Sequence, residues 1–415
     1  MKFNIITLGC KVNSYESQSL KERLIKDGNQ PAKKGEEADV FFINTCAVTS
    51  EAEKKDLQKV RSVARANPGK PIYIMGCSSQ IHKEKYLDIP EVRMVIGNSK
   101  KGSIECIESE NKDQVDLDSR HFVYEDTPTE EGERNVRGYI KVQDGCDNFC
   151  SYCVVPFTRG NSRKRKKDSI LKEAKDLLNH GVKELIIGGI DTGSYSDPEN
   201  PDYRLTQLLS DMLALSDKPY RIRVSSVEAS QIDDAYIALF RNHRDILCPH
   251  FHLPLQSGSQ KILTKMNRKY SLDSFYQLTE KIKKEIPGVA LSCDVITGFP
   301  TETEEDFMDT YHFIEKVGFM RIHAFPYSER PFTMAAKLNG SVPVRVRMDR
   351  VKKLMELSEK NENAFRDSLK GKTVMVLVES RNKSGKYEGY SENYLRFALD
   401  SETDIREDFV PVAIA

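Results

Sequence analysis

The sequence predicts an α/β protein with three successive regions: an N-terminal Rossmann-like domain with a parallel sheet, a central partial (β/α)6 barrel and a small C-terminal β-barrel. Three observations lead to this prediction. Short strands alternate with helical patterns before residue 100, and the alternation resumes on a larger scale after Gly138. The tail after residue 370 consists of short strand-like runs separated by turn signals. Strands that alternate with helices favour parallel sheets.

The N-terminal region contains four short apolar runs rich in β-branched residues, which we predict to be strands. The helical patterns between them cover residues 14–26, 50–67 and 81–86. Because strand and helix alternate, the sheet should be parallel and covered by helices on both faces. The four runs are FNIITLG at 3–9, DVFFINT at 39–45, PIYIMG at 71–76 and VRMVIGN at 92–98.

A polar, acidic stretch from residue 105 to 137 separates this region from the next. It contains ESENKDQ and DTPTEEGE, and we expect a linker with one strand, HFVYE at 121–125. The predicted boundaries place the N-terminal domain at residues 1–110, the acidic linker at 111–134, the central core at 135–365 and the C-terminal domain at 366–415.

The central region contains six predicted strands with helical patterns between them. Six βα units are too few for a closed eightfold barrel, and they fit an open (β/α)6 barrel. The strands are GYIKVQ, ELIIGGI, RIRVSS, HFHLPL, ALSCDVITGF and RIHAFPYS. The helical patterns cover residues 168–179, 205–215, 233–241, 259–265, 271–286 and 304–317.

The C-terminal region begins with a long helical pattern at residues 344–368. Short strand-like runs follow, and turn signals such as Asn-Lys-Ser-Gly at 382–385 interrupt them. Strands of this length with frequent turns favour a compact all-β module. We therefore expect a small β-barrel at the C-terminal end.

Composition limits the classes of function. Lysine plus arginine and aspartate plus glutamate both number 63, so a nucleic-acid partner would need a local basic patch. The sequence contains no run of about 18 apolar residues, so no membrane-spanning helix is predicted. The first apolar stretch reaches Cys10 too soon for a secretory signal peptide. The nine cysteines are clustered or stand at strand ends, which indicates metal binding in a reducing cytoplasm.

Three cysteines, Cys146, Cys150 and Cys153, lie within one predicted loop with the spacing Cys-x3-Cys-x2-Cys. Four cysteines normally hold a [4Fe–4S] cluster, so three local ligands leave one iron open for chemistry. The alternatives are a zinc loop and a structural group of reduced thiols. Zinc would need a fourth cysteine or histidine close by, and none follows in the next stretch.

Cys10, Cys46 and Cys77 each follow a predicted parallel strand of the N-terminal region. The carboxyl ends of such strands meet at one edge of the sheet, where ligands bind. These thiols therefore predict a second site with three ligands, although a single cysteine in such a place is more often a buried apolar residue. The remaining cysteines, Cys106, Cys248 and Cys293, lie in apolar stretches, and we expect them to pack in cores.

The spacing of Cys146, Cys150 and Cys153 resembles the radical SAM enzymes, and the whole chain resembles their methylthiotransferase family. The resemblance implies that S-adenosylmethionine binds the open iron and yields a 5′-deoxyadenosyl radical. It also implies a second [4Fe–4S] cluster on Cys10, Cys46 and Cys77 whose open iron carries sulfur, and a C-terminal RNA-binding TRAM domain. The matching segments are TLGCKVNSYES, NTCAVTSEAEKK, GCSSQ, DGCDNFCSYCVVPFTRG, HFHLPLQSGS, KMNRKY, DVITGFPTETEEDF and GKTVMVLVE with ENYLR.

Within this family, GCKVN, SSVE and FPYSERP are similar to the MtaB type, which acts on N6-threonylcarbamoyladenosine in tRNA. Enzymes for isopentenyladenosine typically carry GCQMN, and those for ribosomal protein S12 typically carry GCPKN. The resemblance implies methylthiolation at C2 of the purine 3′ of the anticodon. Three residues depart from the family pattern: Ala229 replaces a usual proline, and Phe332 and Met334 stand where relatives tend to have glycine and proline.

The resemblance also implies contacts to S-adenosylmethionine. Tyr152 would lie near the adenine, Gly188 and Gly189 would receive the amino group, Glu228 would accept from ribose hydroxyls, and Arg268 would pair with the methionine carboxylate. A strand-to-loop turn at the glycines and surface positions for Glu228 and Arg268 are the alternatives. No side-chain general base is assigned.

The densest basic run, residues 159–167, follows the cysteine loop, and we predict phosphate contacts there. A solvated charged surface is the alternative.

The predicted partners are a tRNA anticodon loop and an electron donor of flavodoxin or ferredoxin type, and the sulfur donor stays open. A monomer is the default. The competing functions are methylthiolation of an aspartate of ribosomal protein S12 and a non-enzymatic iron–sulfur protein that binds RNA or carries electrons. Within the basic run at residues 159–167, the predicted RNA contacts are Arg159, Arg163, Lys164 and Arg165.

Overall fold

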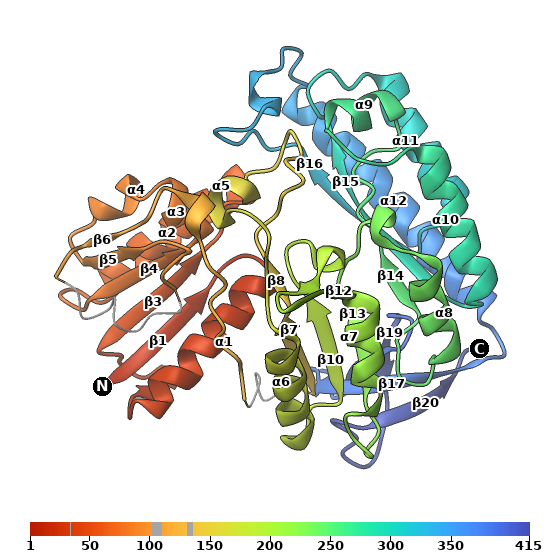
Figure 1. The fold of residues 1–415 in the computed structure, drawn as a ribbon, viewed down its shortest axis with the longest axis horizontal. Helices are drawn as coiled ribbons and strands as arrows, with labels where there is room; N and C mark the ends of the chain where they lie inside the picture. Colours follow the sequence, from red (N-terminus) through yellow and green to blue (C-terminus); the bar gives the residue numbers. More distant parts are fainter. Residues whose placement is uncertain (34, 102–109, 131–135) are drawn as a thin grey trace. The chain divides into compact units, whose positions relative to one another are not determined.

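The computed structural model describes residues 1–33, 35–101, 110–130 and 136–415 (Figure 1). The chain divides into two compact units, and each contains segments from distant parts of the sequence. Unit 1 comprises Met1–Glu130, Tyr139–Glu173 and Ser328–Ala336. Unit 2 comprises Glu131–Gly138, Ala174–Tyr327 and Lys337–Ala415. The domain boundaries expected from the sequence stay predictions.

Unit 1 is built on a six-stranded sheet with the strand order β2-β1-β3-β4-β5-β6. Every neighbouring pair is parallel, which confirms the parallel sheet predicted from the alternation of strands and helices. The strands are β1 (Lys2–Thr7), β2 (Gln30–Pro31), β3 (Val40–Thr45), β4 (Ile72–Gly76), β5 (Val92–Ile96) and β6 (Asp113–Gln114).

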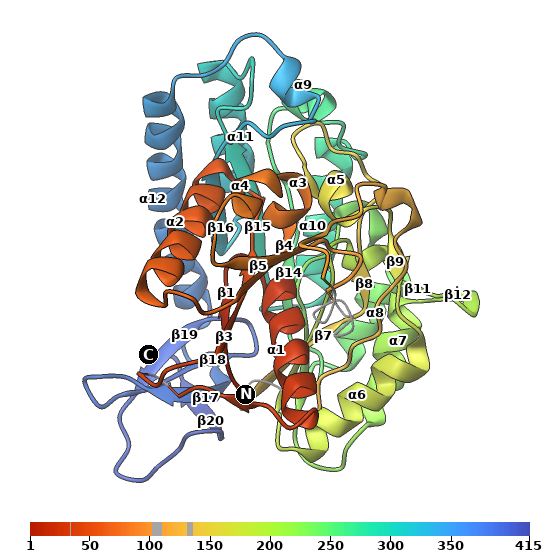
Figure 2. The same cartoon turned by 90° about the vertical axis from the view of Figure 1, so that its left-hand side faces the viewer.

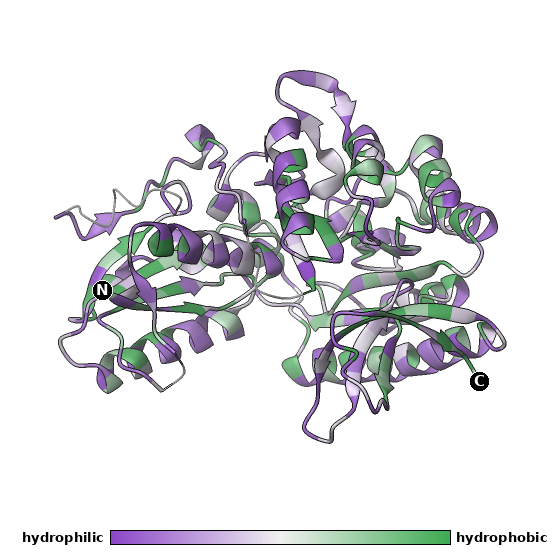
Figure 3. Cartoon of the chain, turned by 90° about the horizontal axis from the view of Figure 1, so that it is seen from below, coloured by the Kyte–Doolittle hydropathy of each residue, from purple (hydrophilic) through white to green (hydrophobic). Residues whose placement is uncertain are grey.

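Helices cover both faces of this sheet. Successive residues of a strand point to opposite faces, so the apolar strands present apolar side chains on both. Leu20 and Leu24 of α1 (Lys11–Lys26) pack with Phe42 on one face. Val60 and Val63 of α2 (Ser50–Ala66) pack with Phe41 and Ile43 on the other. Figure 2 shows the two helices on opposite sides of β1 and β3, and Figure 3 shows hydrophobic residues along the strands.

Two local predictions for the N-terminal region were wrong. The pattern at 81–86 is not one helix: α3 (Cys77–Ile81) and α4 (Glu84–Leu87) flank a break at His82, whose ring lies 3.1 Å from the carboxylate of Glu53. HFVYE is not a strand either. A 3₁₀ turn, η2 (Ser119–His121), precedes residues 122–130, which have no regular structure. Tyr124 instead anchors this stretch, because its hydroxyl donates to the carbonyl of Lys141 over 2.8 Å.

The six strands predicted for the central region form two three-stranded sheets, and five of the six strands lie wholly in unit 2. Their orders are β13-β10-β7 and β14-β15-β16. The pairs β10–β13, β14–β15 and β15–β16 are parallel. The strands are β7 (Arg137–Lys141), which begins in unit 2, β10 (Glu184–Gly188), β13 (Arg221–Val224), β14 (His250–His252), β15 (Ala290–Thr297) and β16 (Arg321–Pro326).

A helix follows most of these strands, and several helices begin at a side-chain cap. Ser271 and Thr303 accept hydrogen bonds from first-turn N–H groups, as expected for N-cap residues. A short hairpin of β11 (Ser196–Asp197) and β12 (Asn200–Arg204) was not predicted. The helices are α6 (Lys167–Asn179), α7 (Leu205–Asp211), α8 (Asp234–Asn242), α9 (Gln260–Lys265), α10 (Leu272–Glu285), α11 (Glu304–Val317) and α12 (Val344–Ser368). Among the described residues, none of the helices combines the length and apolar composition that a bilayer crossing requires.

The C-terminal strands of unit 2 form one antiparallel sheet with the order β19-β18-β17-β20. Its core contains Val374, Val376 and Val378, which pack with Ala290 and Met320. In the part of the chain that is described, β19 and β20 are the sheet edges, so closure into a small β-barrel stays a prediction. The strands are β17 (Thr373–Arg381), β18 (Tyr387–Ser391), β19 (Arg396–Leu399) and β20 (Phe409–Ala413).

A buried ion cluster holds the C-terminal sheet to β10 and β13. The fully buried carboxylate of Glu184 accepts from Arg221 and, over 3.0 Å, from Arg223. The same two guanidiniums donate to four backbone carbonyls of the C-terminal sheet over 2.9 to 3.2 Å. Burial opposes ionisation of Glu184, but Arg223, Arg221 and Arg137 outweigh it and hold its pKa well below the usual range.

Candidate active site

The loop with Cys146, Cys150 and Cys153 lies in unit 1 and is closed at its base by a short antiparallel ladder. β8 (Gln143–Asp144) pairs with β9 (Arg163–Lys164) across the ends of the loop. Inside the loop, the Cys146 N–H donates to the Gly160 carbonyl over 3.0 Å, and the Cys153 N–H donates to the Cys150 carbonyl over 2.9 Å. The three side chains are half-buried and form no disulfide.

Cys10, Cys46 and Cys77 stand where the sequence places them, at the carboxyl ends of β1, β3 and β4. Cys10 is the N-cap of α1, and Cys77 is the first residue of α3. Burial raises the pKa of Cys46 to about 12, and Cys77 and Cys10 add to this shift. The three thiols are therefore close enough to interact electrostatically.

Two glycines allow this approach, and sequence reasoning missed them. Gly9 and Gly76 immediately precede Cys10 and Cys77, and both have a positive φ, of 102° and 109°. A Cβ atom at Gly9 would lie 2.8 Å from the Cβ of Cys46, and one at Gly76 would lie 2.3 Å from the Thr45 carbonyl oxygen. Only glycine accommodates both the backbone conformation and the contact.

The two cysteine groups contact each other through the residues that flank them. Val154, which follows Cys153, packs with Cys77 and Ala47 in a small buried cluster. On the same side, the Asn98 amide donates to the Thr158 carbonyl over 2.6 Å and lies 3.9 Å from the sulfur of Cys77. Helix α5 (Val155–Arg159) packs on α3 (Figure 1). Unit 1 therefore contains both groups, side by side.

The donor atoms fit iron–sulfur clusters better than a single metal ion. In the described ranges, no three histidine, cysteine, aspartate or glutamate side chains are arranged to hold one ion. Each thiolate of a [4Fe–4S] cluster binds a different iron, so its ligands lie further apart than those of one ion. Thiolate ligands also select soft or iron–sulfur centres. Three thiolates would suit a [4Fe–4S] cluster with one iron open, and such a cluster on each group stays a prediction.

Arg159 is not a surface phosphate contact, which corrects the expectation for the basic run. Its side chain is 1% exposed, donates to Glu16 over 2.9 Å and to Asp144 over 3.0 Å, and reaches the Asn13 amide oxygen at 2.8 Å. Burial opposes its charge, but Asp144, Cys77, Glu16 and Cys10 together raise the pKa of Arg159 above its usual value. The Asn13 amide oxygen that accepts from Arg159 lies 3.9 Å from the sulfur of Cys10, so the guanidinium lies close to this thiol.

Arg165 is also corrected, because its guanidinium is completely buried. It pairs with the equally buried Glu173 and lies 2.7 Å from Asp126. Arg163 is only 10% exposed, lies 3.6 Å from Asp144 and donates to backbone carbonyls. Arg159 and Arg165 thus connect the segment after the cysteine loop to helix α1, through Asn13, Tyr15 and Glu16. Phosphate contact by Lys164, which is half-buried, stays a prediction.

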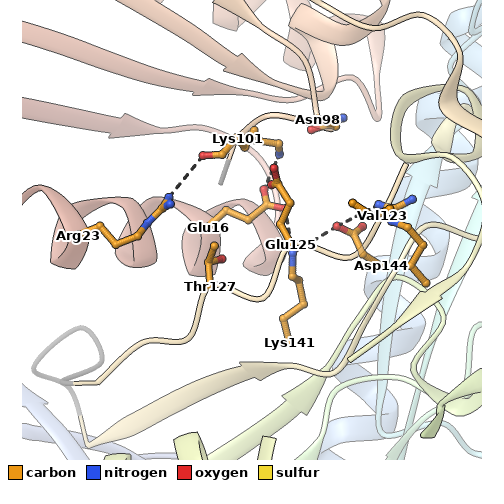
Figure 4. A pocket seen from close by; sticks show the side chains of 10 residues that line it. Glu16, Arg23, Asn98, Lys101, Val123, Glu125, Thr127, Lys141 and Asp144 are labelled. Atoms are coloured by element: carbon orange, nitrogen blue, oxygen red, sulfur yellow. Dashed lines mark hydrogen bonds and ion pairs between the residues drawn. The ribbon is translucent and has the colours of Figure 1, made fainter. Parts of the chain in front are cut away.

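The buried charges line a polar pocket of unit 1, shown in Figure 4. Lys101 lies 2.5 Å and Lys141 lies 3.4 Å from the Glu16 carboxylate, and Lys141 lies 3.3 Å from Asp144. Burial works against the charge of Glu16, but Arg159, Lys101 and Lys141 hold the pKa of Glu16 well below its usual range. The carboxylates are thus fully paired, which suits a structural role rather than proton transfer.

In unit 2, Glu228 and Arg268 pair with each other. The Arg268 guanidinium donates to the Glu228 carboxylate and, over 2.9 Å, to the Pro254 carbonyl, and it lies 5.1 Å from the Tyr270 ring centre. Burial raises the pKa of Glu228 despite the opposing effect of Arg268. The structure joins the two residues in one ion pair, and their contacts to the cofactor stay predictions.

The other residues predicted to contact S-adenosylmethionine are Gly188, Gly189 and Tyr152. Gly188 is the last residue of β10, and Gly189 follows it. Tyr152 precedes Cys153 in the cysteine loop and is half-buried.

Cys248 and Cys293 are 1% and 0% exposed, as expected for packing residues. Cys106 lies outside the described residues.

Two protein-family models match this chain, and each match includes one of the two groups of three cysteines. Residues 140–314 match the family model of the radical SAM superfamily, and residues 2–97 match a family described as uncharacterized protein family UPF0004. The second match covers strands β1 to β5 and includes Cys10, Cys46 and Cys77.

Relatives match nearly the full length of the chain. A Bacillus subtilis (strain 168) protein named threonylcarbamoyladenosine tRNA methylthiotransferase MtaB is 35% identical over 98% of this chain and 92% of its own length. The chain belongs to the methylthiotransferase family of radical SAM enzymes. A Thermotoga maritima protein with the same name is 36% identical over 94% and 90%. A tRNA-2-methylthio-N(6)-dimethylallyladenosine synthase of Thermoanaerobacter sp. (strain X514) is 34% identical over 92% and 83%.

Solved structures share the fold of this methylthiotransferase family member. The radical S-adenosylmethionine methyltransferase TsrM from Kitasatospora setae aligns with a TM-score of 0.59 and 14% identity, over 80% of this chain and 73% of that chain. The cobalamin-dependent S-adenosylmethionine radical enzyme OxsB aligns with a TM-score of 0.54 and 11% identity, over 86% and 56%. Membership of the radical SAM superfamily implies S-adenosylmethionine and one [4Fe–4S] cluster.

We expect Arg159→Gln to destabilise unit 1 of this methylthiotransferase strongly. The substitution removes one of the two cations that the carboxylates of Glu16 and Asp144 share, while Lys141 remains, and breaking a buried pair costs up to about 3–5 kcal/mol. Chemical unfolding followed by circular dichroism measures this, since the chain has no tryptophan. The control Lys26→Gln removes an exposed pair with Glu130 and should change stability by less than about 1 kcal/mol. Equal, small effects of the two changes would contradict the prediction.

Proposed function

We propose that this protein adds a methylthio group to C2 of N6-threonylcarbamoyladenosine at position 37 of tRNA, next to the anticodon, with two [4Fe–4S] clusters. The single observation that carries the proposal is the presence, in one compact unit, of two groups of three cysteines whose flanking residues touch. Radical cleavage and sulfur insertion need two centres close together. Full-length relatives named as threonylcarbamoyladenosine tRNA methylthiotransferases support the substrate.

The residues of this chain would divide the work between the two centres. Cys146, Cys150 and Cys153 would hold the cluster that binds S-adenosylmethionine, and Cys10, Cys46 and Cys77 would hold the second. When bound, these groups supply radical cleavage of S-adenosylmethionine and the sulfur that is transferred. Arg159 places a fixed positive charge near the N-terminal cysteines: its guanidinium donates to the Asn13 amide oxygen, which lies 3.9 Å from the sulfur of Cys10.

The side chains at the site hold and position rather than transfer protons. Two carboxylates near the cysteine loop, Glu16 and Asp144, are paired with buried cations. Removal of a hydrogen atom from C2 needs no base. An anticodon-loop base is unpaired, so presenting it to the site costs at most about a few kcal/mol.

The proposal includes partners that follow from the chemistry. An electron donor of flavodoxin or ferredoxin type would reduce the first cluster, and the C-terminal sheet would contribute to RNA binding as a TRAM domain. We further propose that the protein works as a monomer in the cytoplasm, where thiols stay reduced.

Nucleoside analysis by mass spectrometry tests the substrate. In a strain that lacks this protein, the 2-methylthio form of threonylcarbamoyladenosine should disappear while the unmethylthiolated nucleoside accumulates. The 2-methylthio form of isopentenyladenosine and the modified aspartate of ribosomal protein S12 should be unchanged. Loss of the isopentenyladenosine product instead would assign the activity of the second group of relatives. Loss of the S12 modification alone would overturn the tRNA proposal.

A further inference from the structure

The surface beside the cysteine loop carries an exposed aromatic pair. Phe157, on α5, is 39% exposed, and Phe332 is 60% exposed. Their ring centres lie 5.9 Å apart with the planes tilted by 37°. Single exposed apolar residues are normal on protein surfaces. These two phenylalanines are about 175 residues apart in the chain but meet in unit 1, and Met334, two residues after Phe332, is also exposed. Exposed apolar side chains that gather in this way need an explanation.

The segment that contains Phe332, Ser328–Ala336, is anchored firmly to unit 1. The Ala335 N–H donates over 2.7 Å to the carbonyl of Ser151, which lies between Cys150 and Cys153. At the other end, the buried Arg330 side chain pairs with Glu53 and donates to the Ser50 hydroxyl over 3.2 Å. The loop is therefore held in place from both ends, with the ring of Phe332 on its outer side.

The backbone at Phe332 is unusual for a bulky residue. Its φ is +69°, in the left-handed region that favours glycine. The neighbouring residue Thr333 is 2% exposed and donates to the Arg330 carbonyl over 2.8 Å, which fixes this conformation. Glycine would adopt the same backbone without strain. A strained, exposed phenylalanine is best explained by a role of its ring.

We propose that Phe157 and Phe332 form a stacking platform for an unpaired base of the RNA substrate, a neighbour of the modified purine in the anticodon loop. This inference rests on the proposed function. Bases in single-stranded loops stack on aromatic side chains, and every base offers a flat face. The anchor to Ser151 joins the platform to the loop that holds Cys146, Cys150 and Cys153. A base stacked there would hold the RNA loop beside the site of reaction.

The test compares Phe332→Gly with Phe332→Tyr and with Leu117→Ala, which removes another exposed apolar side chain of unit 1. Fluorescence anisotropy measures the dissociation constant of an anticodon stem-loop RNA that contains N6-threonylcarbamoyladenosine, with cluster-loaded, full-length protein. Phe332→Gly keeps the backbone conformation and should weaken binding roughly 5- to 100-fold, the range for loss of one stacked base. Phe332→Tyr and Leu117→Ala should bind within about twofold of the unsubstituted protein. Formation of 5′-deoxyadenosine without RNA should be equal in all four proteins.

The outcomes separate this inference from the proposed function. If the unsubstituted protein binds and methylthiolates the RNA and Phe332→Gly binds it equally well, the platform is wrong and the function stands. If the unsubstituted protein neither binds nor modifies this RNA, both fail. Equal weakening by Phe332→Tyr would also overturn the platform, because the tyrosine ring preserves stacking.

Discussion

Replacing Cys10, Cys46 and Cys77 together with alanine should halve the iron content and abolish methylthiolation. Protein reconstituted without oxygen should hold about eight irons per chain, and the triple variant about four, because each group of three thiols holds one [4Fe–4S] cluster. Cleavage of S-adenosylmethionine to 5′-deoxyadenosine should continue in the variant, since Cys146, Cys150 and Cys153 lie on a separate loop. Iron analysis and product assays on the same preparation measure both effects.

Cys248 and Cys293 provide the matched control for this experiment. Both are buried in unit 2, and burial raises the pKa of each thiol, as expected for packing cysteines. Alanine at these two positions should leave about eight irons per chain, apart from a cost in stability. An unchanged iron content and unchanged sulfur insertion in the triple variant would overturn the two-cluster proposal.

The sequence predicted the placement of the cysteines well because it depends on local patterns. Cys10, Cys46 and Cys77 follow short apolar runs, and parallel pairing of those runs brings their ends to one edge. The six strands of the central region were likewise recognisable from apolar runs between helical patterns. Each of these predictions needed only the order of elements, not the identity of distant partners.

The predicted phosphate contacts of Arg159 and Arg165 were wrong because these side chains pair with residues far away in sequence. Arg159 pairs with Glu16, which is 143 residues distant, and no local signal separates such an arginine from a solvated one. The ion pair of Glu228 and Arg268, which are 40 residues apart, likewise has no local signal in the sequence. HFVYE has strand-like composition, but its tyrosine is anchored by a single hydrogen bond and the stretch joins no sheet. Tertiary contacts override propensity in these places.

The Glu184→Gln substitution should destabilise unit 2 by about 3–5 kcal/mol, because it leaves buried arginines without their shared carboxylate. Arg221 and Arg223 are 4% and 2% exposed, and Arg137 lies 3.3 Å from the same carboxylate. The arginines also hold the C-terminal sheet through its carbonyls, so the loss should loosen that sheet first. Chemical unfolding by circular dichroism gives the stability, and amide hydrogen exchange in residues 373–413 reports on the sheet.

The pH dependence of this effect distinguishes charge from packing. The folded pKa of Glu184 lies below its unfolded value, so its carboxylate contributes stability above the unfolded pKa of about 4.3, and the contribution is lost as the pH falls toward the folded pKa. The difference between the unsubstituted protein and Glu184→Gln should therefore be largest near neutral pH and shrink below about pH 4. Glu362→Gln, which breaks a half-exposed pair with Arg321, should cost less than about 1 kcal/mol at neutral pH. A Glu184→Gln effect that stayed constant from neutral to acidic pH would show that packing, and not the buried charge, holds the C-terminal sheet.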